Sequence, residues 1–139
     1  ARLTIYPTGN ATLTGSLTQN SSDERLKTNV SIIEGALAKV CSLRGFTYNW
    51  NDLAAELNLF KTDVREVGVS AQEVQAVLPE AVFIAPFDQM KGDSHVSESG
   101  ENYLTVQYEK LTPLLIEAIK EQQAIIESLT ERITALETP

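Results

Sequence analysis

"LTPLLIEAIKEQQAIIESLTERITALE", residues 111–137, repeats apolar side chains at alternating intervals of three and four positions. This spacing places them on one stripe of a helix, which is typical of a coiled coil. The alternative is a single amphipathic helix that packs on its own domain. We expect a coiled coil, with its interface formed by Leu115, Ile119, Gln122, Ile126, Leu129, Ile133 and Leu136.

The number of helices in this coiled coil is only partly specified by the pattern. Isoleucine at the a positions with leucine at d favours a dimer, whereas Ile125 beside the seam widens the apolar stripe. Gln122 adds a polar layer to the core, and Arg132 with Glu137 suits parallel pairing. A trimer is therefore allowed by the sequence but not demanded by it.

Residues 1–22 differ in composition from the rest of the chain. Arg2 is their only charged residue, and most of the others are Ser, Thr, Asn or Gly. Apolar residues alternate over 3–5 and again over 11–17, which predicts two short strands joined by a turn at 7–10. Two such strands are too small to bury their own faces, so we expect the end of a larger β structure that lies upstream.

The segment between these two ends mixes helical and strand patterns and predicts an α+β domain. A helix is expected over 30–41 despite Gly35, and a strand with Tyr48 and Trp50 on its core side follows. Further strands are expected at 66–69 and 82–85, with 88–102 as a mobile loop. A short helix that ends near Leu78 is expected between the strands at 66–69 and 82–85, because Ser70 and Glu73 have capping-box spacing.

Charge and composition exclude several classes of partner. The net charge of −8 argues against binding to nucleic acid or to an anionic membrane, and no apolar stretch is long enough to span a bilayer. Cys41 and His95 are the single residues of their kinds, so neither a disulfide nor a zinc site is expected. We predict no metal and no cofactor, and Cys41 as an inert buried residue on a helix face.

Ser22 and Lys27 stand five positions apart at the composition boundary. In one interpretation Ser22 is a helix N-cap, Asp23 favours the helix start, and Lys27 is a solvated charge. In the other, a lysine base activates a serine nucleophile, which requires burial or a nearby cation such as Arg25 to favour the neutral amine. The spacing alone does not distinguish these interpretations.

Several separated motifs occur in one order and together are more specific than the pair. Over residues 20–137 the chain resembles the C-terminal intramolecular chaperone and self-cleaving domain of bacteriophage tail spikes, tail fibres and neck appendages, the peptidase S74 family. The motifs that carry the resemblance are SDERLKTN at 22–29, LRGFTYNW at 43–50, GVSAQEV at 68–74, LPE at 78–80, LTVQY at 104–108 and PLLIEAIKE at 113–121.

The resemblance implies a homotrimer that guides an upstream fibre or spike of the same polypeptide into its fold and then releases itself. Ser22 matches the nucleophile and Lys27 the general base, with Asp23 and Arg25 in support. Residues 1–22 would then be the end of the fibre, 23–111 the chaperone and autoprotease region, and 112–139 the trimerisation helix. Assembly would take place in the host cytoplasm, and residues up to about Ser22 would stay on the mature fibre.

The bond that breaks stays open between two candidates. Attack by the Ser22 hydroxyl on the carbonyl between Ser21 and Ser22 passes through a five-membered ring, which favours that bond within one chain. The resemblance instead implies cleavage between Ser22 and Asp23, which is easier from another chain or through water. Two rival functions also remain: a trimerisation domain without catalysis, and the same self-cleaving domain in a membrane-bound transcription factor.

Overall fold

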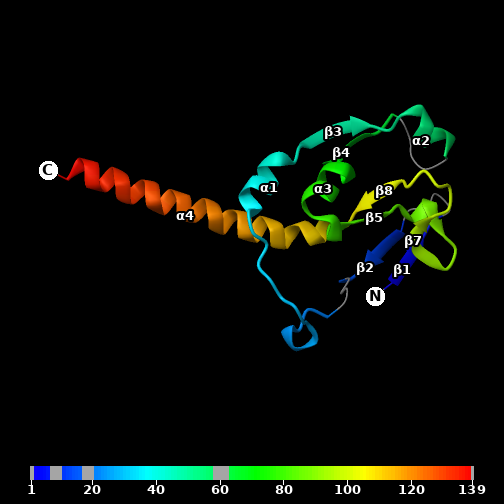
Figure 1. Cartoon of the computed structure of the whole chain (residues 1–139). Coiled ribbons are helices and arrows are strands. Elements are labelled where there is room, and N and C mark those ends of the chain that lie inside the picture. Colours follow the sequence, from blue (N-terminus) through cyan, green and yellow to red (C-terminus); the bar gives the residue numbers. More distant parts are fainter. Residues whose placement is uncertain (1, 7–10, 17–20, 58–62, 139) are drawn as a thin grey trace. The chain divides into compact units, whose positions relative to one another are not determined.

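The computed structural model describes residues 2–6, 11–16, 21–57 and 63–138, in two compact units, Ala1–Ser31 and Ile32–Pro139 (Figure 1). The turn predicted at 7–10 lies outside the described residues. None of the helices in the described ranges is both long enough and apolar enough to cross a membrane.

The first unit carries one small hairpin and one short turn. Strands β1 (Arg2–Ile5) and β2 (Ala11–Thr14) pair antiparallel with Leu3 opposite Leu13, so the two strands expected from the alternation are confirmed. Their apolar side chains stay in solvent, with Ile5 72% exposed. A 3₁₀ turn, η1 (Glu24–Leu26), follows and buries none of its residues.

The core of the second unit lies where two helices cross. Helix α1 (Ala36–Ser42) packs on the N-terminal half of α4 (Leu111–Glu137), with Ala36, Leu114 and Ala118 buried between them (Figure 1). The helix predicted from residue 30 therefore starts six positions late. Gly35 is the reason, because it adopts a left-handed conformation at φ +63° and becomes the N-cap instead of a helical residue.

Two antiparallel strand pairs and a capped helix complete the predicted α+β character. Strand β3 (Gly45–Asn49) pairs with β4 (Arg65–Val69), and β5 (Val82–Ile84) pairs with β8 (Leu104–Val106). Helix α2 (Asp52–Glu56) follows β3, and α3 (Ala71–Val77) follows β4. The expected Ser70 cap is confirmed on α3, since the Ser70 hydroxyl accepts the Glu73 N–H, whereas the Glu73 carboxylate accepts hydrogen bonds from Arg44 N and Nε.

Residues 88–102 are structured, so the prediction of a mobile loop there is wrong. The turn η3 (Pro86–Asp88) leads into a hairpin of β6 (Gln89–Met90) with β7 (Asp93–Ser97). The Asp88 side chain is 2% exposed and accepts hydrogen bonds from Ser97 Oγ, Ser99 N and Tyr103 N. Hydrogen bonds from Ser99, then from Ser97 and Tyr103, outweigh burial and lower the pKa of Asp88 to about 2.

Helix α4 runs for 27 residues and confirms the long C-terminal helix expected from the heptads. Pro113 lies in its first turn, where a missing N–H costs no helical hydrogen bond. Apolar side chains of the predicted seam are exposed along it, with Ile119 64% and Leu136 86% accessible. The chain thus uses one face of α4 for its own core and leaves a second apolar face open.

Two further short turns connect these elements. Turn η2 (Pro79–Ala81) leads from α3 into β5, and η4 (Tyr108–Lys110) leads from β8 into α4. The Tyr108 hydroxyl accepts the Val69 N–H at 3.2 Å and thereby links η4 to the end of β4. The ammonium group of Lys110 lies 4.3 Å from the centre of the Phe83 ring.

Candidate functional site

The structure brings together the two residues of the predicted dyad. The Lys27 ammonium donates a hydrogen bond to the Ser22 hydroxyl at 3.1 Å. Both side chains are exposed and belong to the same compact unit. The distance lies in the range in which a nucleophile and its base exchange a proton.

A single tight turn between the two residues produces this contact. Its backbone bonds run from Leu26 N to Asp23 O at 3.1 Å and from Lys27 N to Glu24 O at 3.0 Å. The side chain of Asp23 caps the turn by accepting the Arg25 N–H at 3.0 Å. Asp23 and not Ser22 is therefore the N-cap, so the interpretation of Ser22 as a capping residue is wrong.

Asp23 and Arg25 form an ion pair beside the dyad. Arg25 Nη2 lies 2.6 Å from Asp23 Oδ2, and Arg25 Nε lies 3.0 Å from Asp23 Oδ1. The Arg25 side chain lowers the pKa of the Asp23 carboxyl, and the carboxylate in turn raises the pKa of Arg25. The guanidinium that was expected to act on the lysine is thus bound to the neighbouring carboxylate.

The arrangement has the parts that serine–lysine chemistry requires. A neutral lysine amine in this position could accept the proton that the Ser22 hydroxyl loses during attack on a carbonyl. Both candidate bonds flank Ser22, and the Ser21 hydroxyl accepts the Asp23 N–H at 3.4 Å. The contact between Lys27 and Ser22 is compatible with cleavage at either bond.

Sequence reasoning missed the role of Glu121 in the second unit. Its carboxylate accepts the N–H groups of Ala36 at 2.8 Å and Leu37 at 2.9 Å, at the start of α1. The bond from Leu37, followed by that from Ala36, lowers the pKa of Glu121. Gly35 could have indicated such a cap, because a helix whose N-cap is glycine has no N-cap side chain and needs an acceptor from elsewhere in the chain.

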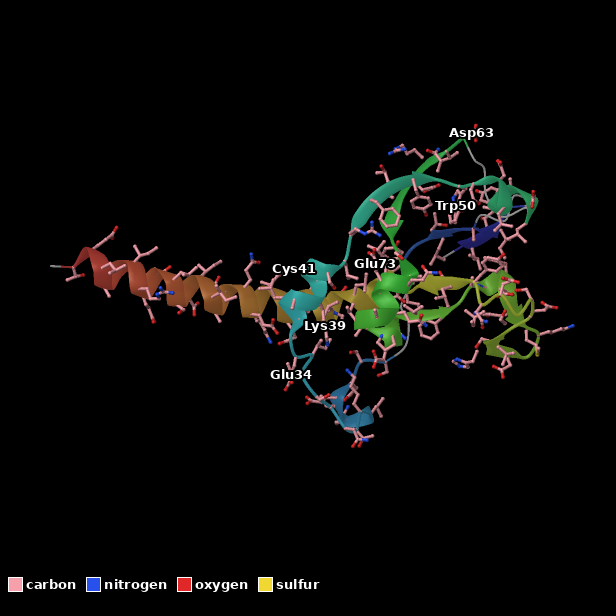
Figure 2. The ribbon with its side chains drawn as sticks, turned by 45° about the horizontal axis from the view of Figure 1, so that its top comes forward. Glu34, Lys39, Cys41, Trp50, Asp63 and Glu73 are labelled. Atoms are coloured by element: carbon pink, nitrogen blue, oxygen red, sulfur yellow. The ribbon has the colours of Figure 1, made fainter. Side chains whose placement is uncertain are left out.

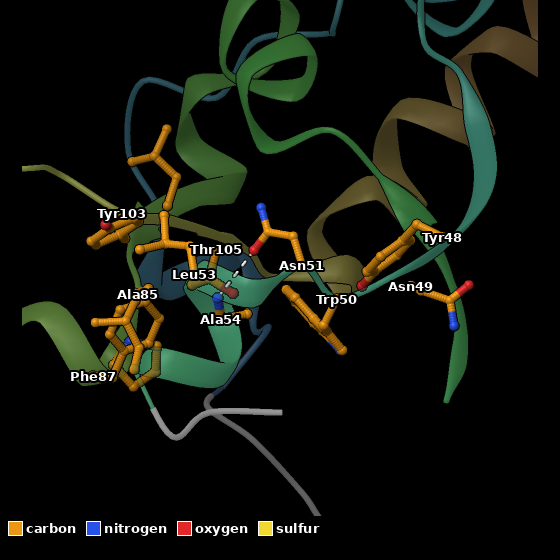
Figure 3. Close-up of a pocket in the computed structure, with 13 residues that line it drawn as sticks. Tyr48, Asn49, Trp50, Asn51, Leu53, Ala54, Ala85, Phe87, Tyr103 and Thr105 are labelled. Carbon is orange, nitrogen blue, oxygen red and sulfur yellow. Dashed lines mark hydrogen bonds between the residues drawn. The ribbon is translucent and has the colours of Figure 1, made fainter. Parts of the chain in front are cut away.

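Cys41 and the pair Tyr48 and Trp50, which were expected on core faces, are more accessible in the structure than the sequence predicted. Cys41 on α1 is exposed, which contradicts the expectation of a buried cysteine (Figure 2). Tyr48 and Trp50 are half-buried, pack edge to face with ring centres 5.1 Å apart, and line a cavity of about 460 Å³ (Figure 3). Among the described residues, the cavity lining consists of aromatic and aliphatic side chains, two asparagines and Thr105, and none of these is charged.

Comparisons with known proteins identify a family and several relatives that this chain is similar to. Residues 22–83 match the peptidase S74 family, described as the chaperone of endosialidase. The long tail fiber protein Gp37 of Enterobacteria phage Ox2 is 35% identical over 137 residues, which are 98% of this chain and 45% of that protein. Gp37 of Enterobacteria phage M1 is 37% identical over 119 residues, or 85% of this chain and 39% of that protein.

A third relative, Gp37 of Enterobacteria phage K3, is 37% identical over 112 residues, or 81% of this chain and 8% of that protein. The chain therefore spans less than half of the length of each of these relatives. The matched family segment begins at Ser22 and includes Lys27.

Proposed function

This chain belongs to the peptidase S74 family of endosialidase-type chaperones, and from that premise we propose that it is the intramolecular chaperone of a phage tail fibre. It drives three copies of the upstream fibre to trimerise and fold, and then releases itself by cleavage next to Ser22. The observation that carries this proposal is the 3.1 Å contact between Lys27 Nζ and Ser22 Oγ within the family segment.

The chaperone role is supported by the apolar surface that a single chain leaves open. Seam residues of α4 such as Ile126, Leu129 and Ile133 are each about half exposed. Three parallel helices would bury this stripe in one another, which stabilises a trimer by the hydrophobic effect. The association would hold three fibre ends together at high effective concentration while they fold.

Trimer formation also offers a physical link between folding and cleavage. Burial of the exposed Lys27 amine against a neighbouring chain would favour its neutral form. The neutral amine accepts the Ser22 proton, and the serine oxygen bonds to the carbonyl carbon. The C–N bond then breaks, the leaving amine takes the proton, and water hydrolyses the ester. Cleavage would thus follow correct assembly.

The two products of cleavage would have different fates. The domain acts in the host cytoplasm during phage assembly, and the residues up to about Ser22 remain on the fibre. The released portion carries α1 to α4 and stays trimeric through α4. The bond between Ser21 and Ser22 and the bond between Ser22 and Asp23 give products that differ by one serine residue.

The deciding experiment incubates the purified precursor beside its Ser22→Ala and Lys27→Met variants. We expect two bands on a denaturing gel for the wild type and one band for each variant. Equal cleavage in the Lys27→Met variant would remove the dyad from the proposal. No cleavage in any sample would favour the second candidate, a trimerisation domain without catalysis, which is also compatible with the relatives being tail fibre proteins.

A further inference from the structure

The contact between Lys27 and Ser22 depends on the turn between them, and we propose that Asp23 is the positioning residue that holds this turn. Asp23 acts through its capping hydrogen bond to the Arg25 N–H and not through its charge. This inference rests on the proposed cleavage by Ser22 and Lys27, and it names a third residue on which the rate depends.

Chain geometry shows why a turn is needed at this place. Five residues in an extended chain span about 17 Å, farther than a lysine side chain reaches. A 3₁₀ turn advances about 2 Å per residue, which brings the two ends within reach of each other. The turn η1 supplies this shortening between Ser22 and Lys27.

The turn has few other interactions to hold it. None of its residues is buried, so hydrophobic burial against the described part of the unit contributes little to its stability. Three residues are below the length at which a helical turn is stable by itself in water. The Asp23 carboxylate satisfies the otherwise free Arg25 N–H at 3.0 Å, which is the contribution that an N-cap makes to a helix start.

The ion pair orients the cap and offsets its charge. Asp23 Oδ1 accepts both the backbone N–H and the Nε of Arg25, so the guanidinium holds the carboxylate in its capping position. An unpaired carboxylate close to a lysine would favour the protonated amine, which cannot act as a base. Arg25 removes much of that penalty, while the pair itself adds little stability because the Arg25 side chain is 88% exposed.

Two substitutions separate capping from charge. Asp23→Asn keeps an oxygen that can cap but loses the charge, whereas Asp23→Glu keeps the charge but moves the carboxylate out of capping distance. In the full precursor, we expect Asp23→Asn to cleave within about twofold of wild type and Asp23→Glu to be roughly fivefold slower, as expected for loss of a cap. Both variants alter the residue after Ser22, so each controls for that change in the other.

The pH dependence of cleavage provides the second measurement. A positioning residue changes the maximal rate, so the pH midpoint of cleavage should be the same in wild type and in the double variant Asp23→Asn/Arg25→Gln, which removes both charges of the ion pair and keeps an oxygen that can cap. A midpoint that falls in this double variant would mean that the charge of the pair acts on the amine, and this would overturn the proposal. Cleavage of Asp23→Asn as slow as that of Asp23→Glu would overturn it as well.

Amide exchange tests the turn without relying on cleavage. In the uncleaved Ser22→Ala precursor, the Arg25 N–H should exchange slowly with Asp or Asn at position 23 and faster with Glu. Equal exchange in all three contradicts the capping role. A wild-type precursor that never cleaves overturns the proposed function and this inference together, whereas a cleaving wild type with a slow Asp23→Asn variant overturns the inference alone.

Discussion

The Glu121 carboxylate on α4 accepts the backbone N–H of Ala36 at 2.8 Å, although 85 positions separate the two residues. A long-range side chain thus caps a helix that begins at a glycine. We predict that Glu121→Ala lowers the Tm of the released domain by about 5 °C, the effect of a lost cap in a small domain. Glu121→Gln retains an oxygen acceptor and should lose less than half as much in the same thermal scan; equal losses would contradict the capping role.

The lowered pKa of Asp88 leads us to predict that the second unit loses stability at acid pH. Its pKa falls from 3.8 to about 2 on folding, so its stabilising contribution is present above about pH 4 and is lost as the pH falls towards 2. Asp88→Asn should be less stable at pH 7, because an amide group faces donors with its own N–H atoms.

The measurement is the urea midpoint as a function of pH. The wild type should lose stability more steeply than Asp88→Asn between pH 4 and pH 2. Ser97→Ala is the matched control, because it removes one of the donors and leaves the carboxyl group in place. If the urea midpoints of wild type and Asp88→Asn fell equally between pH 4 and pH 2, another group would be responsible for the loss of stability at acid pH.

We predict that a side chain at position 68 is destabilising because it would clash with Tyr108. A Cβ atom at this position would lie 2.7 Å from the Tyr108 hydroxyl oxygen, which accepts the Val69 N–H. Gly68→Ala should therefore cost about 1 to 2 kcal/mol in the free energy of unfolding. The double variant with Tyr108→Phe gives the alanine room, so its loss should be smaller than the sum of the two single losses; additive losses would rule out the steric contact.

The open face of α4 predicts which substitutions disrupt assembly. Ile126→Asp places a charge in the proposed trimer core and should weaken association at least tenfold in sedimentation equilibrium. Ala124→Asp is the control, because it adds the same charge to the helix at an exposed position opposite the seam. Equal effects of the two substitutions would contradict the coiled coil.

The accuracy of the sequence-based expectations depends on how local their physical cause is. The long helix α4 and the Ser70 cap were predictable because each follows from residues within a few positions of one another. The pair of Lys27 and Ser22 was expected only from the resemblance, because their five-residue spacing is equally compatible with a helix cap and a solvated charge. Local periodicity and capping chemistry thus account for α4 and α3, whereas the turn η1 with its Asp23 cap was not predicted.

The remaining features depend on contacts that local patterns do not contain. Residues 88–102 were predicted to be a mobile loop because their polar composition is typical of loops. The Asp88 carboxylate, however, accepts hydrogen bonds from donors 9 to 15 positions away. The start of α1 was misplaced because helical spacing continues upstream of Gly35, whereas the conformation of that glycine and the distant cap at Glu121 decide where the helix begins.

The intact masses of a purified precursor before and after incubation test the central claim most directly. The account predicts that the wild-type mass is replaced by two products whose masses add up to that of the precursor plus one water and place the cut beside Ser22. The Ser22→Ala and Lys27→Met precursors should keep their full mass. A wild-type precursor that stays intact as a stable trimer, or a Lys27→Met precursor that cleaves at the wild-type rate, would contradict the account.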